Sequence, residues 1–583
     1  MSIVQPAASF GRVISVRGSQ ARVGLLAASG LSSADIRATV GRFISIRNPQ
    51  SIIVAIITEV TREQSSASDQ YFATASVDLL GEIFGDQSQQ RFRRGVTSYP
   101  AIDDAADLIT NQELRTIYAP RGTDQVNIGT LQQDASVTAY VDVEEMLSKH
   151  FAVLGSTGVG KSSGVSLLLN EILKARPNLR IFLLDVHNEY GRCFGERALV
   201  LNPRNLKLPF WLFNFEEIVD VLFGGRPGVP EELEILTEVI PLAKGVYTQY
   251  QRGDRTGLKR VDSKTNVYTA DTPVPYRLVD LISLIDERMG RLENRSSRIV
   301  YHKLISRIET VRNDPRYAFM FENANVGGDT MAEVISHLFR LPANGRPMTV
   351  MQLAGFPAEV VDSVVSVLCR MAFDFGLWSD GVSPLLFVCE EAHRYASADR
   401  SIGFGPTRKA VSRIAKEGRK YGVYLGLVTQ RPAELDATII SQCSTLFTMR
   451  LANDRDQSLL RSAVSDAAAN LLSFVPSLGT REVLAFGEGV ALPTRLRFKE
   501  VPAHQLPRSE ATIATTPSTV RGHDAHFVGS VLERWRGATS HRDAMSEHGQ
   551  IERPTPRTTD APLLQPSLGL DPDRFSLLKK PLR

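Results

Sequence analysis

Residues 155–162 read Gly-Ser-Thr-Gly-Val-Gly-Lys-Ser. The apolar stretch 151–154 runs directly into this segment, and the residues after it are apolar at roughly helical spacing: Val165, Leu167, Leu168, Leu169, Ile172 and Leu173. A strand, a glycine-rich loop and a helix in this order distinguish a phosphate-binding loop (P-loop) from a chance match. An ordinary glycine-rich turn is the alternative, and the complete motif in this context argues against it.

The residue types of the loop suit a bound polyphosphate. Glycines let the backbone turn tightly so that its N–H groups face an anion, and the following helix adds its positive end. The lysine reaches the β- and γ-phosphates, and the serine hydroxyl binds Mg²⁺. We therefore predict ATP and Mg²⁺ as ligands. The residues expected to bind them are Gly155, Ser156, Thr157, Gly158, Val159, Gly160, Lys161, Ser162 and Ser163.

The composition is that of an ordinary soluble protein. A chain of 583 residues should hold two or three domains, and its net charge of +3 is too small to indicate a nucleic-acid partner by itself. The four scattered cysteines have no metal-ligand spacing and are typical of reduced thiols. No signal peptide and no apolar run long enough to cross a bilayer is present, so we expect a cytoplasmic protein without a membrane partner.

Two folded regions are predicted. Residues 1–130 contain short β-rich runs separated by turn residues, which favour a small β-barrel. From residue 131 to 505, buried strands alternate with helices, as in an α/β domain. The clearest expected strands of this core are Ile181–Leu184, Met348–Leu353, Leu385–Cys389 and Val423–Val428.

Two further segments depart from this pattern. Residues from about 205 to 345 are mostly helical, which suggests an insertion into the α/β core. Residues 506–583 are rich in Pro, Ser, Thr, Arg and Asp, and we expect a partly disordered C-terminal tail.

Hydrolysis needs carboxylates, and one expected strand supplies two. The strand Leu385–Cys389 ends in Glu390 and Glu391, followed by Ala392 and His393. We predict that Glu390 holds Mg²⁺, usually through its water shell, and that Glu391 polarises the attacking water. An acidic pair that caps the next helix is the alternative, and the upstream P-loop favours catalysis.

Two more strand ends carry polar residues. The strand Val423–Val428 leads to Gln430, which is expected to sense the γ-phosphate or orient water, unless Pro432 merely opens a turn there. Asp185 follows the strand Ile181–Leu184 and, with Glu189, can support the metal or water network. Ligands of open α/β sheets gather at this edge.

A basic segment runs from Arg408 to Lys420. A solvated charged face and a subunit interface are both consistent with it. In ring ATPases a neighbouring subunit supplies an arginine to the transition state. Arg419 is the first candidate for this role and Arg413 the second.

Taken in order, these pieces resemble the HerA family of DNA translocases, within the FtsK–HerA group of P-loop ATPases. The resemblance covers roughly residues 1–500. It is carried by Arg94-Gly95-Val96 with Tyr99-Pro100, by Ile128-Gly129, by His150 before the P-loop, by Asp185-x-His187-x-Glu189-Tyr190, by Glu390-Glu391-Ala392-His393, by Glu417-Gly418-Arg419-Lys420 and by Gln430-Arg431-Pro432.

The resemblance implies that the α/β domain is the RecA-like core of an ATP-dependent motor, which forms a hexameric ring around double-stranded DNA. It implies that the barrel helps assembly and partner docking, that Glu391 activates water, and that Arg419 acts in trans. Relatives work with a nuclease or another effector, in DNA end processing or in defence against phage. Three residues depart from the common pattern: Glu390 in place of Asp, Lys149 in place of Arg, and Asn188 in place of Gly.

Other functions remain open at this point. A ring that binds ATP only to assemble and activate an effector enzyme has the same motifs. A motor for protein or single-stranded DNA would be favoured by a membrane anchor or a substrate-recognition domain, and neither is evident. A GTPase is disfavoured because the chain lacks an Asn-Lys-x-Asp motif.

Overall fold

The computed structural model describes most of the chain up to Arg508. The described residues are 10–26, 38–62, 71–85, 90–120, 122–251, 267–291, 294–322, 324, 328–464, 466–508, 528–529, 531–533 and 536. The predicted tail therefore lies almost entirely outside them.

The N-terminal strands form a closed barrel. Their order is β2-β1-β7-β3-β4-β5, and β5 pairs back with β2, so the sheet has no open edge there. Among the described strands, β6 pairs only with β5. The elements of this region are β1 (Gly11–Arg17), β2 (Gln20–Leu26), β3 (Phe43–Arg47), β4 (Ile52–Thr61), β5 (Tyr71–Phe84), β6 (Arg91–Arg94), β7 (Ala105–Leu108) and α1 (Asn111–Tyr118). The predicted small barrel is confirmed.

The second sheet has the strand order β12-β13-β11-β14-β15-β10-β16-β17-β18-β8-β9. Neighbours from β12 to β16 run parallel, and the remaining pairs are antiparallel. Its strands are β8 (Gln125–Leu131), β9 (Thr138–Asp142), β10 (His150–Leu154), β11 (Arg180–Asp185), β12 (Ala198–Leu201), β13 (Met348–Gln352), β14 (Leu385–Cys389), β15 (Val423–Thr429), β16 (Cys443–Thr448), β17 (Glu482–Gly487) and β18 (Thr494–Phe498).

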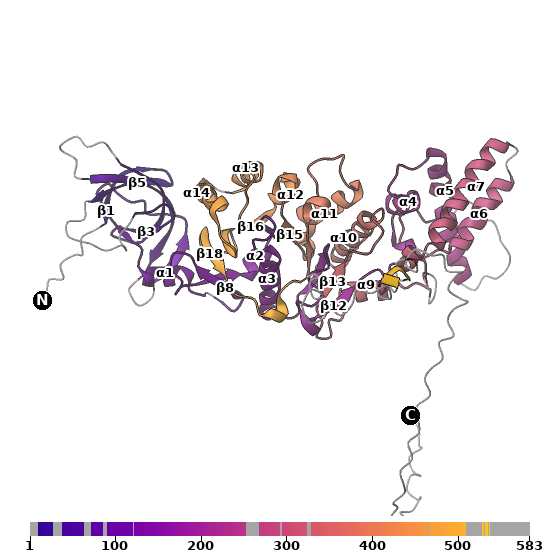
Figure 1. Ribbon diagram of the computed structural model, residues 1–583, viewed down its shortest axis with the longest axis horizontal. Helices are drawn as coiled ribbons and strands as arrows, with labels where there is room; N and C mark the ends of the chain where they lie inside the picture. Colours follow the sequence, from indigo (N-terminus) through magenta and orange to yellow (C-terminus); the bar gives the residue numbers. More distant parts are fainter. Residues whose placement is uncertain are drawn as a thin grey trace, which may run out of the picture.

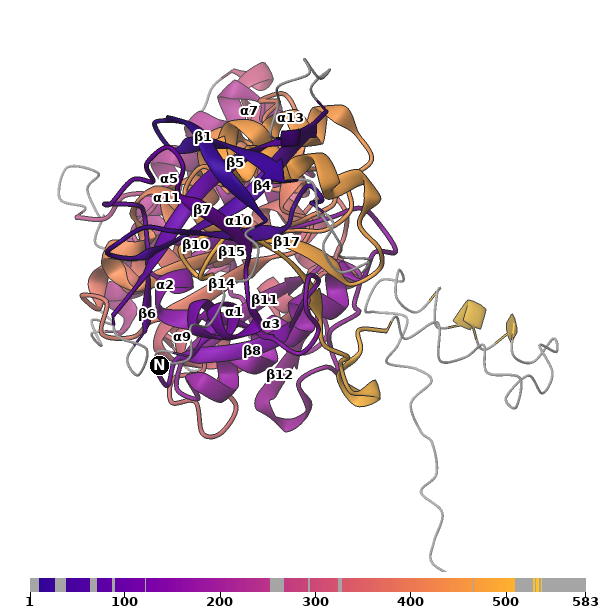
Figure 2. The ribbon, with the colours of Figure 1, turned by 90° about the vertical axis from the view of Figure 1, so that its left-hand side faces the viewer.

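The central strands are buried on both faces, as parallel strands covered by helices must be. Helices α10 and α11 pack together above β14 and β15, whereas α3 packs below the sheet against β10 and β8 (Figures 1 and 2). The helices of the α/β core outside the run between β12 and β13 are α2 (Val143–Leu147), α3 (Lys161–Ala175), α10 (Val361–Trp378), α11 (Gly405–Glu417), α12 (Ala437–Ile440), α13 (Asp454–Ala463) and α14 (Asp466–Leu471). The predicted RecA-like α/β core is confirmed.

A run of helices separates β12 from β13 in the sequence. These are α4 (Phe215–Phe223), α5 (Pro230–Gln251), α6 (Leu278–Gly290), α7 (Arg295–Asn313), α8 (Ala318–Phe321) and α9 (Met331–Leu338). Figure 1 shows α5, α6 and α7 at the opposite end of the molecule from the barrel. The α/β core therefore lies between these helices and the barrel.

Two further observations bear on where the protein can reside and on its cysteines. Within the described part, no helix is both long and apolar enough to cross a membrane. All four cysteines are free thiols.

Candidate active site

The P-loop connects the end of β10 to the start of α3. Gly158 and Gly160 have φ values of 79° and 95°, a region that favours glycine, and Gly160 is the N-cap of α3. The N–H of Gly155 donates to the Thr429 carbonyl (3.2 Å) and the N–H of Ser156 to the Arg450 carbonyl (3.0 Å). The base of the loop is thus fixed to the ends of β15 and β16.

Lys161 is the first residue of α3 and is buried, with 7% of its surface exposed. Its Nζ atom makes no hydrogen bond with any described residue and lies 3.6 Å from Glu391 Oε1. Burial lowers the pKa of Lys161, and the nearby Glu391 and Glu390 oppose that effect. A buried cation with its donors unused is prepared to receive an anion.

The adjacent carboxylates of Glu390 and Glu391 reach the same site because the chain turns sharply between them. Glu391 has φ +48°, a left-handed conformation that non-glycine residues adopt rarely and mostly at functional sites. Its carboxylate oxygens lie 3.8 Å from His187 Nε2 and 3.3 Å from His393 Nδ1. Glu391 therefore faces a lysine and two imidazoles.

Glu390 lies in a different environment. It is 2% exposed, and its Oε2 accepts a hydrogen bond from the Val186 N–H at 3.2 Å. Burial, helped by the neighbouring carboxylate of Asp185, raises the pKa of Glu390 to about 8. A carboxyl group with so high a pKa gains from a nearby divalent cation, which would replace the proton.

Asp185 organises the loop that follows β11. It is fully buried, and its two oxygens accept from the N–H groups of Glu189 (3.0 Å) and Tyr190 (2.9 Å). Burial raises the pKa of Asp185. Within this loop Asn188 has φ +55°, which explains why asparagine can stand where glycine is common. Asp185 thus contacts backbone groups, and its expected support of the metal or water network stays a prediction.

Gln430 contacts the P-loop directly. Thr157 Oγ1 donates to Gln430 Oε1 at 2.6 Å, so the end of β15 and the tip of the loop are joined through side chains. Thr429 Oγ1 lies 3.0 Å from His393 Nδ1 and accepts from the Arg431 N–H at 3.0 Å. These bonds connect the Gln430 segment to the Glu391 turn.

Arg419 lies at the opposite edge of the sheet. It belongs to the 3-10 turn Gly418–Tyr421, just before β15 begins, whereas the P-loop contacts the end of that strand. A strand of seven residues spans roughly 20 Å. Within one chain, therefore, Lys161, Glu391, Glu390 and Gln430 come together and Arg419 does not.

Two further residues contact this site and were not predicted from the sequence. Arg481, at the start of β17, donates its N–H to the Val159 carbonyl at 3.0 Å. The backbone carbonyl of Arg450 accepts hydrogen bonds from the Ser156 N–H and, at 2.9 Å, from the Ser156 hydroxyl. Neither arginine stands in a recognisable motif, and no strand was predicted beside either of them, so nothing in the sequence marked them.

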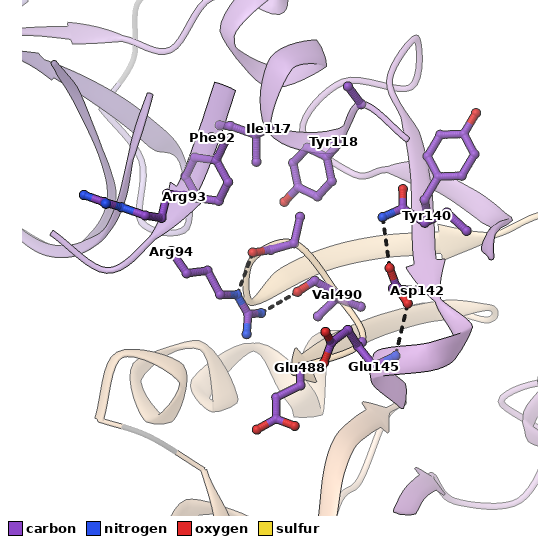
Figure 3. Close-up of a pocket in the computed structure, with 14 residues that line it drawn as sticks. Phe92, Arg93, Arg94, Ile117, Tyr118, Tyr140, Asp142, Glu145, Glu488 and Val490 are labelled. Atoms are coloured by element: carbon purple, nitrogen blue, oxygen red, sulfur yellow. Dashed lines mark hydrogen bonds between the residues drawn. The ribbon is translucent and has the colours of Figure 1, made fainter. Parts of the chain in front are cut away.

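A cavity of about 470 Å³ lies away from the P-loop, between the barrel and the α/β core (Figure 3). Arg94, the last residue of β6, extends into the turn between β17 and β18. It donates to the carbonyls of Ala491 (2.8 Å), Gly487 (2.6 Å) and Val490. This arginine is the main polar connection visible there between the two parts of the chain.

Comparison with known proteins agrees with this geometry. Residues 126–372 match the family model described as the central domain of the helicase HerA. The DNA double-strand break repair helicase HerA of Pyrococcus furiosus is 26% identical over 77% of this chain and 82% of its own length. The protein of the same name from Sulfolobus acidocaldarius is 24% identical over 80% of this chain and 85% of its own.

Among solved structures, VirB4 of Thermoanaerobacter pseudethanolicus aligns with a TM-score of 0.43 and 14% identity, over 66% of this chain and 98% of that one. Residues 126–372 match the HerA central domain, and the chain is similar over most of its length to helicases named HerA.

Proposed function

We propose that the protein is an ATP-driven translocase or helicase for double-stranded DNA. It works as a hexameric ring with a nuclease or another effector protein, in DNA end processing or anti-phage defence. One observation carries the catalytic part: Lys161 and Glu391 lie 3.6 Å apart at the edge where the parallel strands end. Relatives over most of the chain are named DNA double-strand break repair helicases, which supports DNA as the partner.

The residues present fit ATP and Mg²⁺. The unbonded Lys161 Nζ and the left-handed glycines of the loop suit a polyphosphate. Ser162 and Glu390 are the residues that would hold Mg²⁺. Among the described residues, no three His, Cys, Asp or Glu side chains converge on one metal position. The remaining ligands would therefore be phosphate oxygens and water, as is usual for Mg²⁺.

The chain's own groups divide the catalytic work. Lys161 leaves Glu391 and binds the β- and γ-phosphates, which frees the carboxylate of Glu391 to orient and polarise water. Gln430 senses the γ-phosphate position through its bond to Thr157 on the loop. Bound Mg²⁺ supplies charge neutralisation of the phosphates.

A surface patch supports the contribution of Arg419 in trans. We define the Trp378 patch as Trp378, Val382, Arg419 and Lys420. Trp378 and Val382 are 84% and 82% exposed. A β-carbon on Gly422 would lie 3.0 Å from the carbonyl oxygen of Gly381, so the two turns that carry the patch are packed together.

A tryptophan left in water beside a basic turn is typical of a surface that an assembly covers. In a ring, the same two unlike surfaces meet at every subunit boundary. The Trp378 patch lies at the edge where strands begin, and Glu391 at the edge where they end. Head-to-tail packing of these edges brings Arg419 toward the phosphates of the next subunit.

The test uses the full-length protein and linear duplex DNA. We expect duplex to stimulate phosphate release at low salt, with less stimulation as salt rises, because contacts to the DNA backbone release counterions. Displacement of a bound third strand reports translocation, and native mass measurement with ATP and duplex reports the ring. The Lys161→Ala variant is the matched negative control. Wild-type protein that hydrolyses ATP equally with and without duplex at low salt would overturn the proposal.

A further inference from the structure

The loop after β11 carries a tyrosine whose hydroxyl group has no partner. Tyr190 is fully buried, and its hydroxyl oxygen makes no hydrogen bond with any described residue. A buried hydroxyl of this kind costs stability, because it gives up its hydrogen bonds to water and gains none in return. Such groups are rare in folded proteins, and those that occur call for a ligand or another explanation. The surroundings of Tyr190 therefore decide what its hydroxyl binds.

The backbone of Tyr190 is fixed on both sides. Its N–H donates to Asp185 Oδ2 at 2.9 Å, and its carbonyl accepts from the Cys193 N–H at 3.0 Å. The carbonyl of Glu189, one residue earlier, accepts from the Arg508 N–H at 3.1 Å. Because the backbone is held and the ring is buried, the hydroxyl stays at one position.

The loop after β11 continues along one face of α3, the helix that follows the P-loop. Ser162, Ser166 and Asn170 are spaced four residues apart and share that face. The Arg197 guanidinium donates to Asn170 Oδ1. Closer to the P-loop, burial raises the pKa of the Cys193 thiol to about 12, and the nearby Ser166 hydroxyl opposes that effect. Each step back along the loop is thus about one turn back along α3, toward Ser162.

The hydroxyl of Tyr190 has the two expected Mg²⁺ ligands as neighbours. Burial raises the pKa of Tyr190, the negative charge of Glu390 raises it further, and the nearby Ser162 hydroxyl opposes both effects. This position agrees with the order of contacts along α3, in which the turn before Ser166 is that of Ser162. The unpaired hydroxyl therefore lies beside the place where Mg²⁺ would bind, and not against an apolar part of the core.

Mg²⁺ suits such a group because it keeps much of its own water. The ion usually retains several bound waters and takes only one or two protein oxygens beside the substrate phosphates. Residues in the layer around the bound groups form hydrogen bonds to them and help to hold the ion. A tyrosine hydroxyl can accept one such bond and donate another. A hydrated ion at this place would therefore give the Tyr190 hydroxyl the partner that it lacks.

We propose that Tyr190 is a positioning residue of the Mg²⁺ site, whose hydroxyl bonds to the water shell of the ion that Ser162 and Glu390 hold. The inference rests on the proposed nucleotide site and adds a residue to its metal half. Tyr190 acts on the binding of the metal–nucleotide complex and not on the contacts between the P-loop and phosphate. Asp185 gains a role as well, because it holds the backbone of Tyr190 in place.

The experiment measures how much Mg²⁺ strengthens nucleotide binding. Titration calorimetry on the full chain gives the affinity for adenylyl imidodiphosphate, a non-hydrolysable ATP analogue, once in Mg²⁺ and once in EDTA. The ratio of the two affinities is the Mg²⁺ enhancement. Tyr190→Phe removes one oxygen atom and keeps the ring. It should lower the enhancement by about tenfold, as the loss of an outer-layer partner does at other metal sites, and leave the affinity in EDTA unchanged.

Tyr395→Phe is the matched control. Tyr395 follows the short turn after β14, is also buried, and also has a hydroxyl without a hydrogen-bond partner among the described residues. Its charged neighbours are Arg394 and Asp362, and not the expected metal ligands. The Mg²⁺ enhancement of this variant should therefore equal that of the wild type. Because each variant loses an unpaired buried hydroxyl, neither should melt below the wild type without nucleotide.

The outcomes separate this inference from the proposed function. A wild-type enhancement in Tyr190→Phe overturns the inference, and so does an equal loss of affinity in Mg²⁺ and in EDTA, which would mean that the hydroxyl only supports the P-loop. A lowered enhancement in Tyr395→Phe, or a lower melting temperature of nucleotide-free Tyr190→Phe, overturns it as well. Wild-type protein that binds the analogue equally in Mg²⁺ and in EDTA, or not at all, refutes the metal or nucleotide site of the proposed function instead.

Discussion

Replacement of Glu391 by glutamine separates nucleotide binding from hydrolysis. Glutamine keeps the size of the side chain and removes its charge. The carboxylate attracts Lys161 across 3.6 Å, which corresponds to about 5 kcal/mol at an effective dielectric constant of about 20. Desolvation of both buried ions offsets most of this attraction. We expect a net gain of about 1 kcal/mol in ATP binding, or roughly fivefold, because Lys161 no longer has to leave a carboxylate.

Hydrolysis should move in the opposite direction. Without a carboxylate to polarise water, the phosphate release rate should fall by about 10²- to 10⁴-fold. Calorimetry gives the affinity and a phosphate-release assay gives the rate, with and without duplex DNA. Glu434→Gln is the control, since that exposed residue is paired with Arg431 at 2.9 Å and makes no ion pair with Lys161.

Two results would refute this reasoning. Wild-type hydrolysis in Glu391→Gln would mean that another group activates water. Weaker ATP binding would mean that the Lys161–Glu391 pair does not compete with phosphate. The same variant also tests the scaffold function: an effector that stays fully active while hydrolysis stops would favour a ring that only assembles its partner.

Three other substitutions test separate parts of the molecule. Thr157→Val and Gln430→Ala should each weaken ATP binding by about 1 kcal/mol. The double variant should lose less than the sum of the two, because the two side chains share one hydrogen bond of 2.6 Å. Fully additive losses of affinity in calorimetry would contradict this shared role. Trp378→Ser should shift the ATP-bound assembly toward monomers in native mass measurements while ATP affinity stays unchanged; an intact ring would show that the Trp378 patch is not an interface. Burial lowers the pKa of His150 below 6.5. In the acid range the unfolded chain therefore binds a proton at this histidine that the folded chain does not. The free energy of unfolding then falls as pH drops below about 6.5, by at most about 1.4 kcal/mol per pH unit. The melting-temperature difference between wild type and His150→Gln should therefore shrink from about pH 7 to about pH 5, and a constant difference would contradict the buried neutral histidine.

Much of the α/β core could be predicted because its strands are unusually simple. The strand Leu385–Cys389 is apolar at every position and buried at every position, so its boundaries in the sequence and in the structure agree. The strand expected at Val423–Val428 extends one residue further, to Thr429. Because both faces of these strands are buried, their sequences are apolar throughout and do not alternate between apolar and polar residues, so their ends are easy to place.

The meeting of Lys161 with Glu391 could also be anticipated, since the ends of parallel strands share one edge. The different environments of Glu390 and Glu391 could not be predicted. Glu391 adopts a left-handed conformation, and the high pKa of Glu390 depends on its burial and on charged groups from β11, α3 and the turn after β14. Two adjacent glutamates look equivalent in a sequence, and burial makes them chemically different.

Arg94 shows why the rest could not be predicted. Arg94 stands in one of the motifs that resemble the HerA family, but its partners, the carbonyls of Gly487, Val490 and Ala491, are almost 400 residues away and carry no side-chain signature. Strand β17 ends at Gly487 and begins just after Arg481, which donates its N–H to the P-loop. Arg94 therefore binds the turn after β17 (Figure 3), and Arg481, just before the same strand, contacts the phosphate loop. Backbone carbonyls are the same at every position, so only the folded structure can show which of them an arginine binds.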